Sequence, residues 1–323
     1  MLKLKEKWRI VLIIGVFLLI LIILPFMSNK YWIRILTTIF MYTTLAQATN
    51  ILMGFTGLVP FGNVVFFGIG AYLTGILMVD FGLSFFPALI FGAVVCFAFA
   101  SIIGYPILKL KGHYFAIATM GVSEAIKQIA TNTQITRGGM GFNLPLIPLK
   151  IEAAYFFFYF LMFCAMVLVT FATYWISKNR IGYALRGIMS NEEGAKSLGI
   201  NTAYYKLIAW GISAFFTGIA GGIFAYWYSY IDPPSVFDIG IAVRFIIMLL
   251  LGGAGTIIGP FLGAFFIELV TETIWSKFLF LHLGVLGGII VLVVIFMPKG
   301  FVWFYRQRFS LSALLENVRK GKL

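Results

Sequence analysis

Long apolar segments, separated by short charged ones, constrain this chain more than any other feature. A helix needs about 20 residues to cross a hydrocarbon core of roughly 30 Å. Of the 323 residues, 61% are apolar and 11% are charged, against about half and a quarter in soluble domains. We therefore expect an all-α integral membrane protein, a polytopic bundle of about ten transmembrane helices. The apolar windows place these spans at residues 9–27, 33–53, 62–79, 84–108, 113–131, 153–177, 207–230, 240–252, 260–276 and 282–298.

The basic residues predict how these helices are oriented. The net charge is +13, but the cations form short runs beside the apolar segments. This pattern is typical of membrane orientation and argues against nucleic acid as a partner. With a cytoplasmic N-terminus, 17 of the 24 lysines and arginines fall on the cytoplasmic side. We expect both termini in the cytoplasm. The first apolar segment is expected to be retained, because no small-x-small cleavage site follows it.

Two segments, 54–62 and 252–260, interrupt the apolar sequence with glycine and proline. Each follows one predicted span and leads into another. Irregular backbone at membrane depth must face protein or water, so one interpretation is a pair of discontinuous helices lining a substrate path. The alternative is a pair of tight cytoplasmic turns. The path candidates from these segments are Gly54, Gly57, Pro60, Gly62, Gly252, Gly255 and Gly259.

Small residues four positions apart recur along the spans. Such spacing lets helix backbones approach closely in a membrane, where lipid supplies no hydrophobic drive for helix association. The pattern predicts a closely packed bundle and no particular function. Its members are Gly218/Gly222, Gly259/Gly263 and Gly284/Gly288.

Residues 178–206 form the longest polar segment between spans. Ser190 and Glu193 have the spacing of a capping box, and Gly199 is placed to end a helix in a left-handed conformation. The helix between them has about two turns and is marginal in water by itself, so we expect it to dock against another surface. The preceding stretch has the apolar spacing of an amphipathic helix, with Ile181, Ala184, Leu185 and Ile188 on one face.

The sequence Glu193-Gly-Ala-x-x-x-Gly199 resembles the Glu-Ala-Ala-x-x-x-Gly signature of ABC importer permeases. Its flanks look like the LivM-type permease subunits of branched-chain amino acid importers. Four other stretches are similar to the same family, and the resemblance covers residues 33–301: Gly54 to Tyr72, Lys111 to Glu124, Thr136 to Gly141 and Gly252 to Gly263. Two places depart from the family pattern: Ser190-Asn191-Glu192 replaces Arg-Glu-Asp/Glu, and Gly194-Ala195 replaces paired alanines.

This resemblance implies a domain organisation. A permease domain is expected over residues 1–305, with 178–206 as the cytoplasmic coupling segment, and a basic cytoplasmic tail over 306–323. The residues implied in coupling to an ATPase are Arg186, Ser190, Glu192, Glu193, Gly194, Ala195 and Gly199. Three further path candidates lie in the Lys111-to-Glu124 stretch: Tyr114, Thr119 and Glu124.

The resemblance also implies a function and partners. It implies a permease in a bacterial or archaeal plasma membrane, working with ABC ATPase subunits, a second homologous permease and an extracytoplasmic solute-binding protein. The chain has no Gly-x-x-x-x-Gly-Lys-Ser/Thr motif, so ATP and Mg²⁺ are expected on the partner subunits. We expect no metal site, no cofactor and no enzymatic activity in this chain.

Ionisable residues within predicted spans are functional hypotheses, because charge is expensive inside a membrane. Glu124 and Lys127 are three residues apart and can pair on one helix. Glu124 lies in a family-like stretch, so a role at the path or at a helix joint is weighed against a structural pair. Glu268 is interpreted as structural, and Arg244 is left open.

Three other functions compete with amino-acid import. A permease for urea or short amides belongs to the same class. An ion-coupled secondary transporter with glycine-broken helices would need no capped cytoplasmic helix at residues 190–199, and that helix argues against it. An intramembrane enzyme would need catalytic spacings such as His-Glu-x-x-His or Gly-x-Ser-x-Gly, and the sequence has neither.

Overall fold

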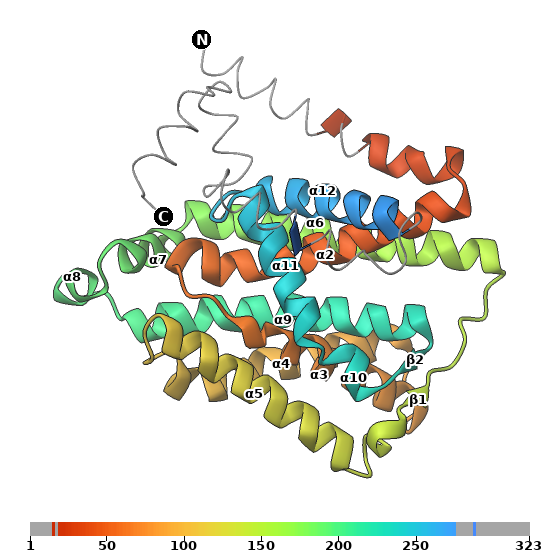
Figure 1. Ribbon diagram of the computed structural model, residues 1–323, viewed down its shortest axis with the longest axis horizontal. Coiled ribbons are helices and arrows are strands. Elements are labelled where there is room, and N and C mark those ends of the chain that lie inside the picture. Colours follow the sequence, from red (N-terminus) through yellow and green to blue (C-terminus); the bar gives the residue numbers. More distant parts are fainter. Residues whose placement is uncertain (1–14, 17–18, 276–286, 289–323) are drawn as a thin grey trace.

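A computed structural model describes residues 15–16, 19–275 and 287–288, and this part of the chain is built mainly of helices (Figure 1). Residues 19–27 form a helix that leads through a bend into the rest of the bundle. The numbered α-helices are α2 (Lys30–Thr56), α3 (Val64–Val79), α4 (Phe85–Ile107), α5 (His113–Asn132), α6 (Ile151–Lys178), α7 (Arg180–Ser190), α8 (Glu192–Ser197), α9 (Thr202–Tyr228), α10 (Pro233–Val236), α11 (Ile239–Gly252) and α12 (Gly259–Trp275).

The expectation of an all-α membrane protein holds, and five helices or helix runs in the described part are long and apolar enough to cross a membrane. They are Phe61–Val79, Phe85–Ile107, Ile151–Lys178, Thr202–Tyr228 and Pro233–Gly252. Helices α2, α5 and α12 also occupy the predicted spans 33–53, 113–131 and 260–276, the last as far as Trp275. These three helices are not among the five that are long and apolar enough to cross a membrane. Most of the predicted span 282–298 lies outside the described residues, as does the tail 306–323.

Helix α2 is central to the bundle, although its sequence contains many polar residues. Of its 27 residues, 22 are buried, and α6, α9, α11 and α12 all pack against it. Four of its five buried threonines donate to a carbonyl of the same helix, and the fifth, Thr49, accepts from Asn63. The hydroxyls of Thr37, Thr43 and Thr44 each donate to the carbonyl four residues earlier, at 2.7–2.8 Å. A helix surrounded by protein therefore tolerates polar side chains that lipid would not.

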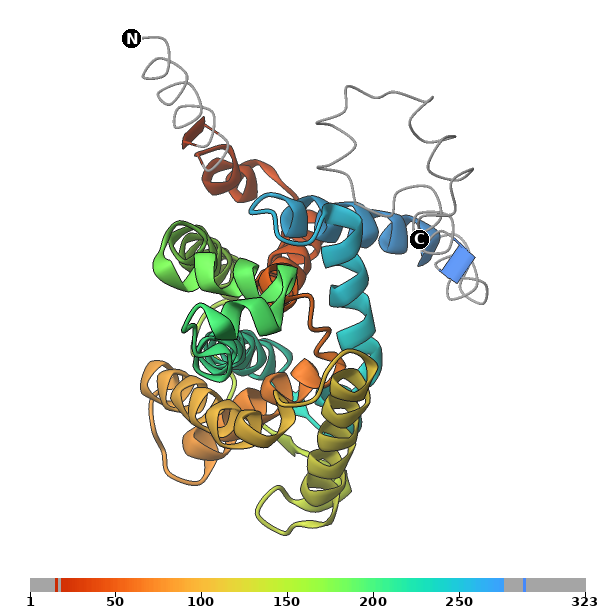
Figure 2. The ribbon, with the colours of Figure 1, turned by 90° about the vertical axis from the view of Figure 1, so that its left-hand side faces the viewer.

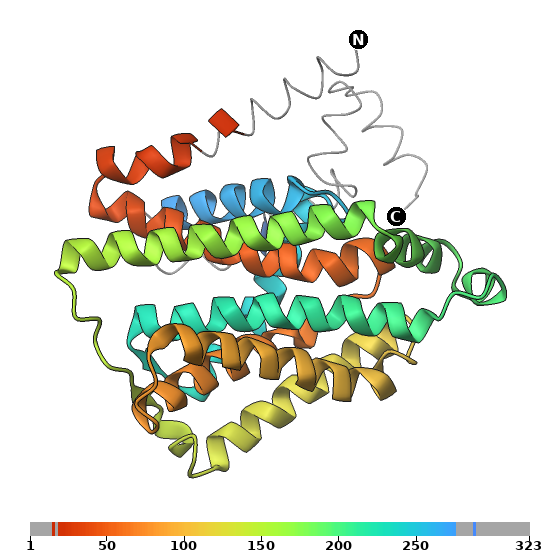
Figure 3. The same cartoon turned by 180° about the vertical axis from the view of Figure 1, so that it is seen from behind.

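The long helices run back and forth between two ends of the bundle (Figures 1 and 3). One end, here the α8 end, carries α7, α8 and the α4–α5 connection. The other, here the strand end, carries the 133–150 connection and the short antiparallel pair of β1 (Phe142–Asn143) and β2 (Tyr230–Ile231). Seen from the α8 end, α5 and α11 line one side of the bundle, and α4 and α6 lie on the opposite side (Figure 2).

Glycines let α9 pack closely on α3 and α4. A Cβ on Gly70 of α3 would overlap the carbonyl of Gly218, and a Cβ on Gly222 would overlap the hydroxyl of Thr74. A Cβ on Gly263 would likewise overlap a carbonyl of α11. The predicted small-xxx-small packing is therefore confirmed for Gly218/Gly222 and Gly259/Gly263; the third pair begins outside the described residues.

Candidate functional site

Helix α7 lies against the bundle along the apolar face that the sequence predicts. The guanidinium of Arg186 donates to the carbonyl of Ser177 at 2.9 Å and lies over the rings of Phe55 and Tyr183, 5.7 Å and 4.9 Å from their centroids. Arg186 is therefore engaged by its own chain and fixes α7 to the ends of α2 and α6. The predicted apolar face is buried at Ala184, Leu185 and Ile188.

Helix α8 begins one residue later than the sequence predicts. The predicted capping box between Ser190 and Glu193 is wrong, because Ser190 is the last residue of α7 and its hydroxyl donates back to an α7 carbonyl. The side chain of Asn191 is the cap, and its Oδ1 accepts from the amide of Gly194 at 3.0 Å. Asparagine and serine are about equally good caps, so sequence alone does not choose between neighbours.

The end of α8 is confirmed. Gly199 has φ of +80°, the left-handed conformation that glycine adopts most readily. Its amide donates to the carbonyl of Lys196 at 2.9 Å, and the amide of Ile200 donates to that of Ala195 at 3.0 Å. These two hydrogen bonds satisfy carbonyls that the helix end would otherwise leave unpaired.

Two carboxylates anchor α8 to different parts of the bundle. Glu192 binds Lys206 of α9 at 2.7 Å and accepts from the Thr202 hydroxyl at 3.3 Å, while Glu193 binds Lys111 of the α4–α5 connection at 3.1 Å. The Lys206 side chain is only 3% exposed. Burial opposes ionisation of Glu192, but the hydrogen bond and charge of Lys206 outweigh it and lower the pKa. The hydrogen bond from Lys111 lowers the pKa of Glu193.

The two faces of α8 differ in what they contact. Ala195 is 4% exposed and faces the rest of this chain, whereas Leu198 is 82% exposed. Ser197 and Lys196 are also exposed, and α8 projects beyond the bundle at the left of Figure 1. Of the residues implied in coupling, Ser190, Glu193 and Gly199 are exposed, while Ala195 helps to seat the helix. The exposed Leu198 was not among the candidates.

The first glycine-broken segment is an irregular connection that returns into the bundle. Gly57, with φ of +76°, ends α2, and the chain then runs through Pro60 to a 3₁₀ turn, η1 (Phe61–Asn63), which leads into α3. A Cβ on Gly62 would overlap the backbone of Thr119, so η1 lies directly against α5. This segment is not a tight turn at the surface.

A buried hydrogen-bond network holds η1 in place. Asn63 is fully buried, and its Nδ2 donates to the hydroxyls of Ser213 at 2.9 Å and Thr49 at 3.2 Å. Its Oδ1 accepts from the indole N–H of Trp210 at 2.8 Å. Asn63 thus joins α2, η1 and α9. Sequence reasoning missed this residue, although an asparagine inside an apolar span was a usable signal.

The second broken segment is a turn between α11 and α12, held by polar side chains of α2. Asn50 donates to the carbonyl of Thr256 at 2.7 Å and accepts from the amide of Gly255 at 2.8 Å. A Cβ on Gly54 would overlap the backbone of Gly255, so the two glycine-broken segments meet at this point. Gly252 and Gly259 pack against each other at the two ends of the turn.

The path candidates on α5 divide between its two faces. Thr119 is buried against η1, while Tyr114 is 75% exposed and Glu124 is exposed. Glu124 accepts a hydrogen bond from Gln128 at 2.9 Å; the described ion pairs do not include one with Lys127. Exposed residues recur every three or four positions along α5 and form one face of it: Tyr114, Ile117, Gly121, Glu124 and Gln128.

The other intramembrane charges form a separate cluster. The guanidinium of Arg244 on α11 donates to the hydroxyl of Tyr42 on α2 at 3.0 Å and lies over its ring. Glu268 of α12 is 7% exposed. Because these groups lie between three packed helices, the cluster fits a structural role.

The chain is also similar in sequence to known membrane transport proteins. The family described as branched-chain amino acid transport system / permease component matches residues 31–294. The chain belongs to this family. The high-affinity branched-chain amino acid transport system permease protein LivM of Salmonella typhimurium is 28% identical to it, over 92% of this chain and 76% of that protein. LivM of Escherichia coli K12 is 28% identical, over 89% and 74%. The autoinducer 2 import system permease protein LsrC of Photorhabdus laumondii is 28% identical over 41% of each chain.

No solved structure matches the chain. The family and the apolar helices together make this chain a multi-pass membrane protein and a transport permease component. The resemblance inferred from residues 33–301 is thus confirmed over nearly the same range.

Proposed function

We propose that this chain is the transmembrane permease subunit of an ATP-binding-cassette importer for branched-chain or other hydrophobic amino acids. The observation that carries the proposal is α8. It is a capped helix of six residues that projects from the bundle, and Glu192 ties it to the buried Lys206. A helix this short is unstable unless it is docked, so its exposed face is available to a partner while its inner face is fixed.

The partners follow from this role. Separate ATPase subunits would bind ATP and Mg²⁺ and receive the exposed face of α8. A second homologous permease and an extracytoplasmic solute-binding protein would complete the importer in a bacterial or archaeal plasma membrane. The chain itself would bind no cofactor and catalyse no reaction. In the described residues, no three His, Cys, Asp or Glu side chains gather as a metal site.

One face of α9 connects α8 to the centre of the bundle. Lys206, Trp210 and Ser213 are separated by four and then three residues, so they lie on the same side of the helix. Lys206 binds Glu192 of α8, while Trp210 and Ser213 bind Asn63 of η1. A displacement of α8 would therefore move α9 and η1 together. ATP would drive the change only by binding one arrangement more tightly than the other.

The exposed face of α5 would form this subunit's side of the substrate path. Lipid is a poor neighbour for Glu124 and Gln128, and a second permease or water would satisfy them. The segment 57–63 packs on the opposite, buried face of the same helix, because Gly62 lies against Thr119. Displacement of η1 by α9 would thus push on α5 from behind and move the wall of the path with it.

Reconstitution tests the function. Vesicles containing this chain, the second permease and the ATPases, supplied with the binding protein, are expected to accumulate leucine only with ATP. Accumulation driven by an ion gradient without the ATPases would instead support a secondary transporter. Uptake of urea but not leucine would support the amide permease.

Orientation is tested separately. Cys96 and Cys164 are replaced first, and single cysteines are then placed at Asn143 in β1 and at Ser197 in α8. Impermeant thiol reagents are expected to label Asn143→Cys from outside and Ser197→Cys only from the cytoplasmic side. Labelling of both from one side would contradict the placement of the strand end and the α8 end on opposite sides of the membrane.

A further inference from the structure

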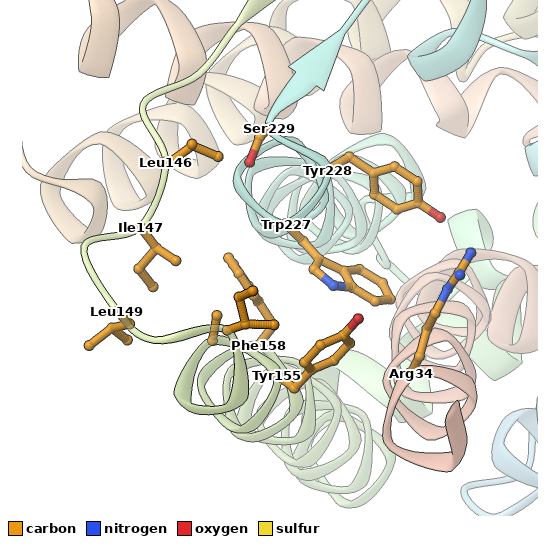
Figure 4. Close-up of a pocket in the computed structure, with 11 residues that line it drawn as sticks. Arg34, Leu146, Ile147, Leu149, Tyr155, Phe158, Trp227, Tyr228 and Ser229 are labelled. Atoms are coloured by element: carbon orange, nitrogen blue, oxygen red, sulfur yellow. The ribbon is translucent and has the colours of Figure 1, made fainter. Parts of the chain in front are cut away.

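A pocket of about 460 Å³ lies at the strand end, between the start of α2, the start of α6 and the end of α9 (Figure 4). The 144–150 connection closes one side of it. Tyr155, Phe158, Trp227 and Tyr228 form its aromatic wall, and Arg34 projects into it from α2. Neither the coupling segment nor the α5 face contributes to this pocket.

The described lining of the pocket carries a positive charge and no negative one. Arg34 is exposed, and none of the described residues lining the pocket is acidic. At the rim, Lys30 binds Glu152 at 3.0 Å, and Lys150 lies between the lining residues Leu149 and Ile151. With Glu272, which accepts from the hydroxyl of Tyr31 beside Lys30, the surroundings hold three cations and two carboxylates, a net positive charge. No described carboxylate forms an ion pair with the Arg34 guanidinium, so an anion could bind it here.

The rest of the lining is mainly apolar, as a surface that contacts lipid acyl chains would be. Leu146 and Ile151 are 80% and 73% exposed, beside the aromatic wall. Tyrosine and tryptophan favour the depth of lipid head groups, where their rings contact acyl chains and their polar atoms reach water. The pocket therefore combines a cation at head-group depth with an apolar surface of the kind an acyl chain contacts.

We propose that this pocket binds an anionic phospholipid, with its phosphate on Arg34 and the upper part of an acyl chain against Phe158 and Trp227. A hydrophobic amino acid is the competing ligand. It is a zwitterion, and the described lining offers no carboxylate for its ammonium group. An anionic lipid needs only the cation and the apolar wall, so the lining favours the lipid.

Quenching of Trp227 by brominated lipids tests this assignment. The full chain is reconstituted in phosphatidylcholine vesicles containing equal fractions of brominated phosphatidylglycerol or brominated phosphatidylcholine. The contribution of Trp227 is the difference between the wild type and Trp227→Phe. We expect stronger quenching by the phosphatidylglycerol, and a loss of about fivefold in that preference in Arg34→Gln, the usual effect of one basic residue near an anionic surface.

Two variants make the test specific. Arg34→Lys keeps the charge and is expected to keep most of the preference. Lys127→Gln removes one cation near the strand end of α5, outside the pocket, and should leave the preference unchanged. Equal quenching by the two lipids, or a preference that survives in Arg34→Gln, would overturn the proposal.

A leucine titration separates the competing ligand. It is performed in unbrominated phosphatidylcholine vesicles with Trp227 fluorescence as the signal. No saturable change is expected. A saturable change that Arg34→Gln abolishes would assign the pocket to free amino acids and reject the lipid. This outcome is independent of ATP-driven uptake, so it would leave the proposed transport function standing.

Discussion

Helix α8 and the turn η1 are both short elements held by side chains from elsewhere in the bundle, but the attachments differ in kind. Glu193 holds α8 through an exposed charged pair with Lys111, and Glu192 holds it through a charged pair with the buried Lys206. Asn63 holds η1 through neutral hydrogen bonds that are fully buried. Charged pairs respond to pH, and the exposed one also responds to salt, whereas buried neutral hydrogen bonds respond to neither. Helix α8 is therefore held by an attachment that pH can release, whereas η1 is held by a permanent joint.

Asn63→Leu is expected to have the largest effect. It would leave the Trp210 indole N–H without its acceptor and remove the link to Ser213 and Thr49. Each unsatisfied buried group costs about 1–3 kcal/mol, so we expect the bundle to lose roughly 3 kcal/mol or more. Thermal unfolding in detergent measures this loss. Asn143→Leu, at an exposed site in β1, is the control, and an unchanged unfolding temperature in Asn63→Leu would refute the joint.

Lys206→Met is expected to act on coupling more than on the bundle. It removes a hydrogen bond to a charged group, worth about 1.5–3 kcal/mol, from the seat of α8. Leucine uptake should fall while ATP hydrolysis continues, with little change in unfolding temperature. The double variant Glu192→Lys/Lys206→Glu restores opposite charges and should recover part of the uptake. Equal loss in the single and double variants would show that the pair does not transmit the motion.

Acid should release α8 but leave η1 in place. The pKa of Glu192 is lowered in the folded state, so its pairing stabilises the docked helix above the ordinary value of 4.5 and is lost as pH falls through the lowered value. A spin label on Ser197→Cys is expected to stay immobile from neutral pH down to 4.5 and to become mobile below it. Mobility independent of pH would contradict the charged attachment.

Gly199→Ala should have a smaller effect. The left-handed conformation costs a residue with a Cβ about 1 kcal/mol, and the space around Gly199 is open, so strain is the main consequence. Partial loss of coupled uptake is expected. Gly187→Ala is the matched control, because Gly187 lies within α7, also in open space, and alanine favours a helix. Normal coupling in Gly199→Ala would show that the end of α8 does not need this cap.

Lys111→Ala should have the smallest effect. Its pair with Glu193 is exposed on both sides, at 67% and 66%, and such pairs contribute less than about 1 kcal/mol. The expected result is a slight reduction in uptake at low salt that disappears at high salt. A large loss that persists at high salt would mean that Lys111 itself contacts a partner.

Features that depend on neighbours along the chain could be predicted from the sequence. Apolar windows predicted the positions of the long described helices, a periodicity of three and four predicted the buried face of α7, and Gly199 predicted the end of α8. Each of these follows from helix geometry or from the freedom of one backbone position. The ordered motifs also predicted the family, which the comparison confirmed.

How distant segments meet could not be predicted in this way and is seen first in the folded bundle. Asn63 binds Ser213 and Trp210 from about 150 residues away, and Asn50 binds the turn at Gly255 over a similar separation. Even the local choice of Asn191 over Ser190 as the cap of α8 depended on where the packing of α7 ended. Periodicity records which face of a helix is buried, but it does not record the partner. A hydrogen bond between remote side chains exists only once the bundle has brought them together.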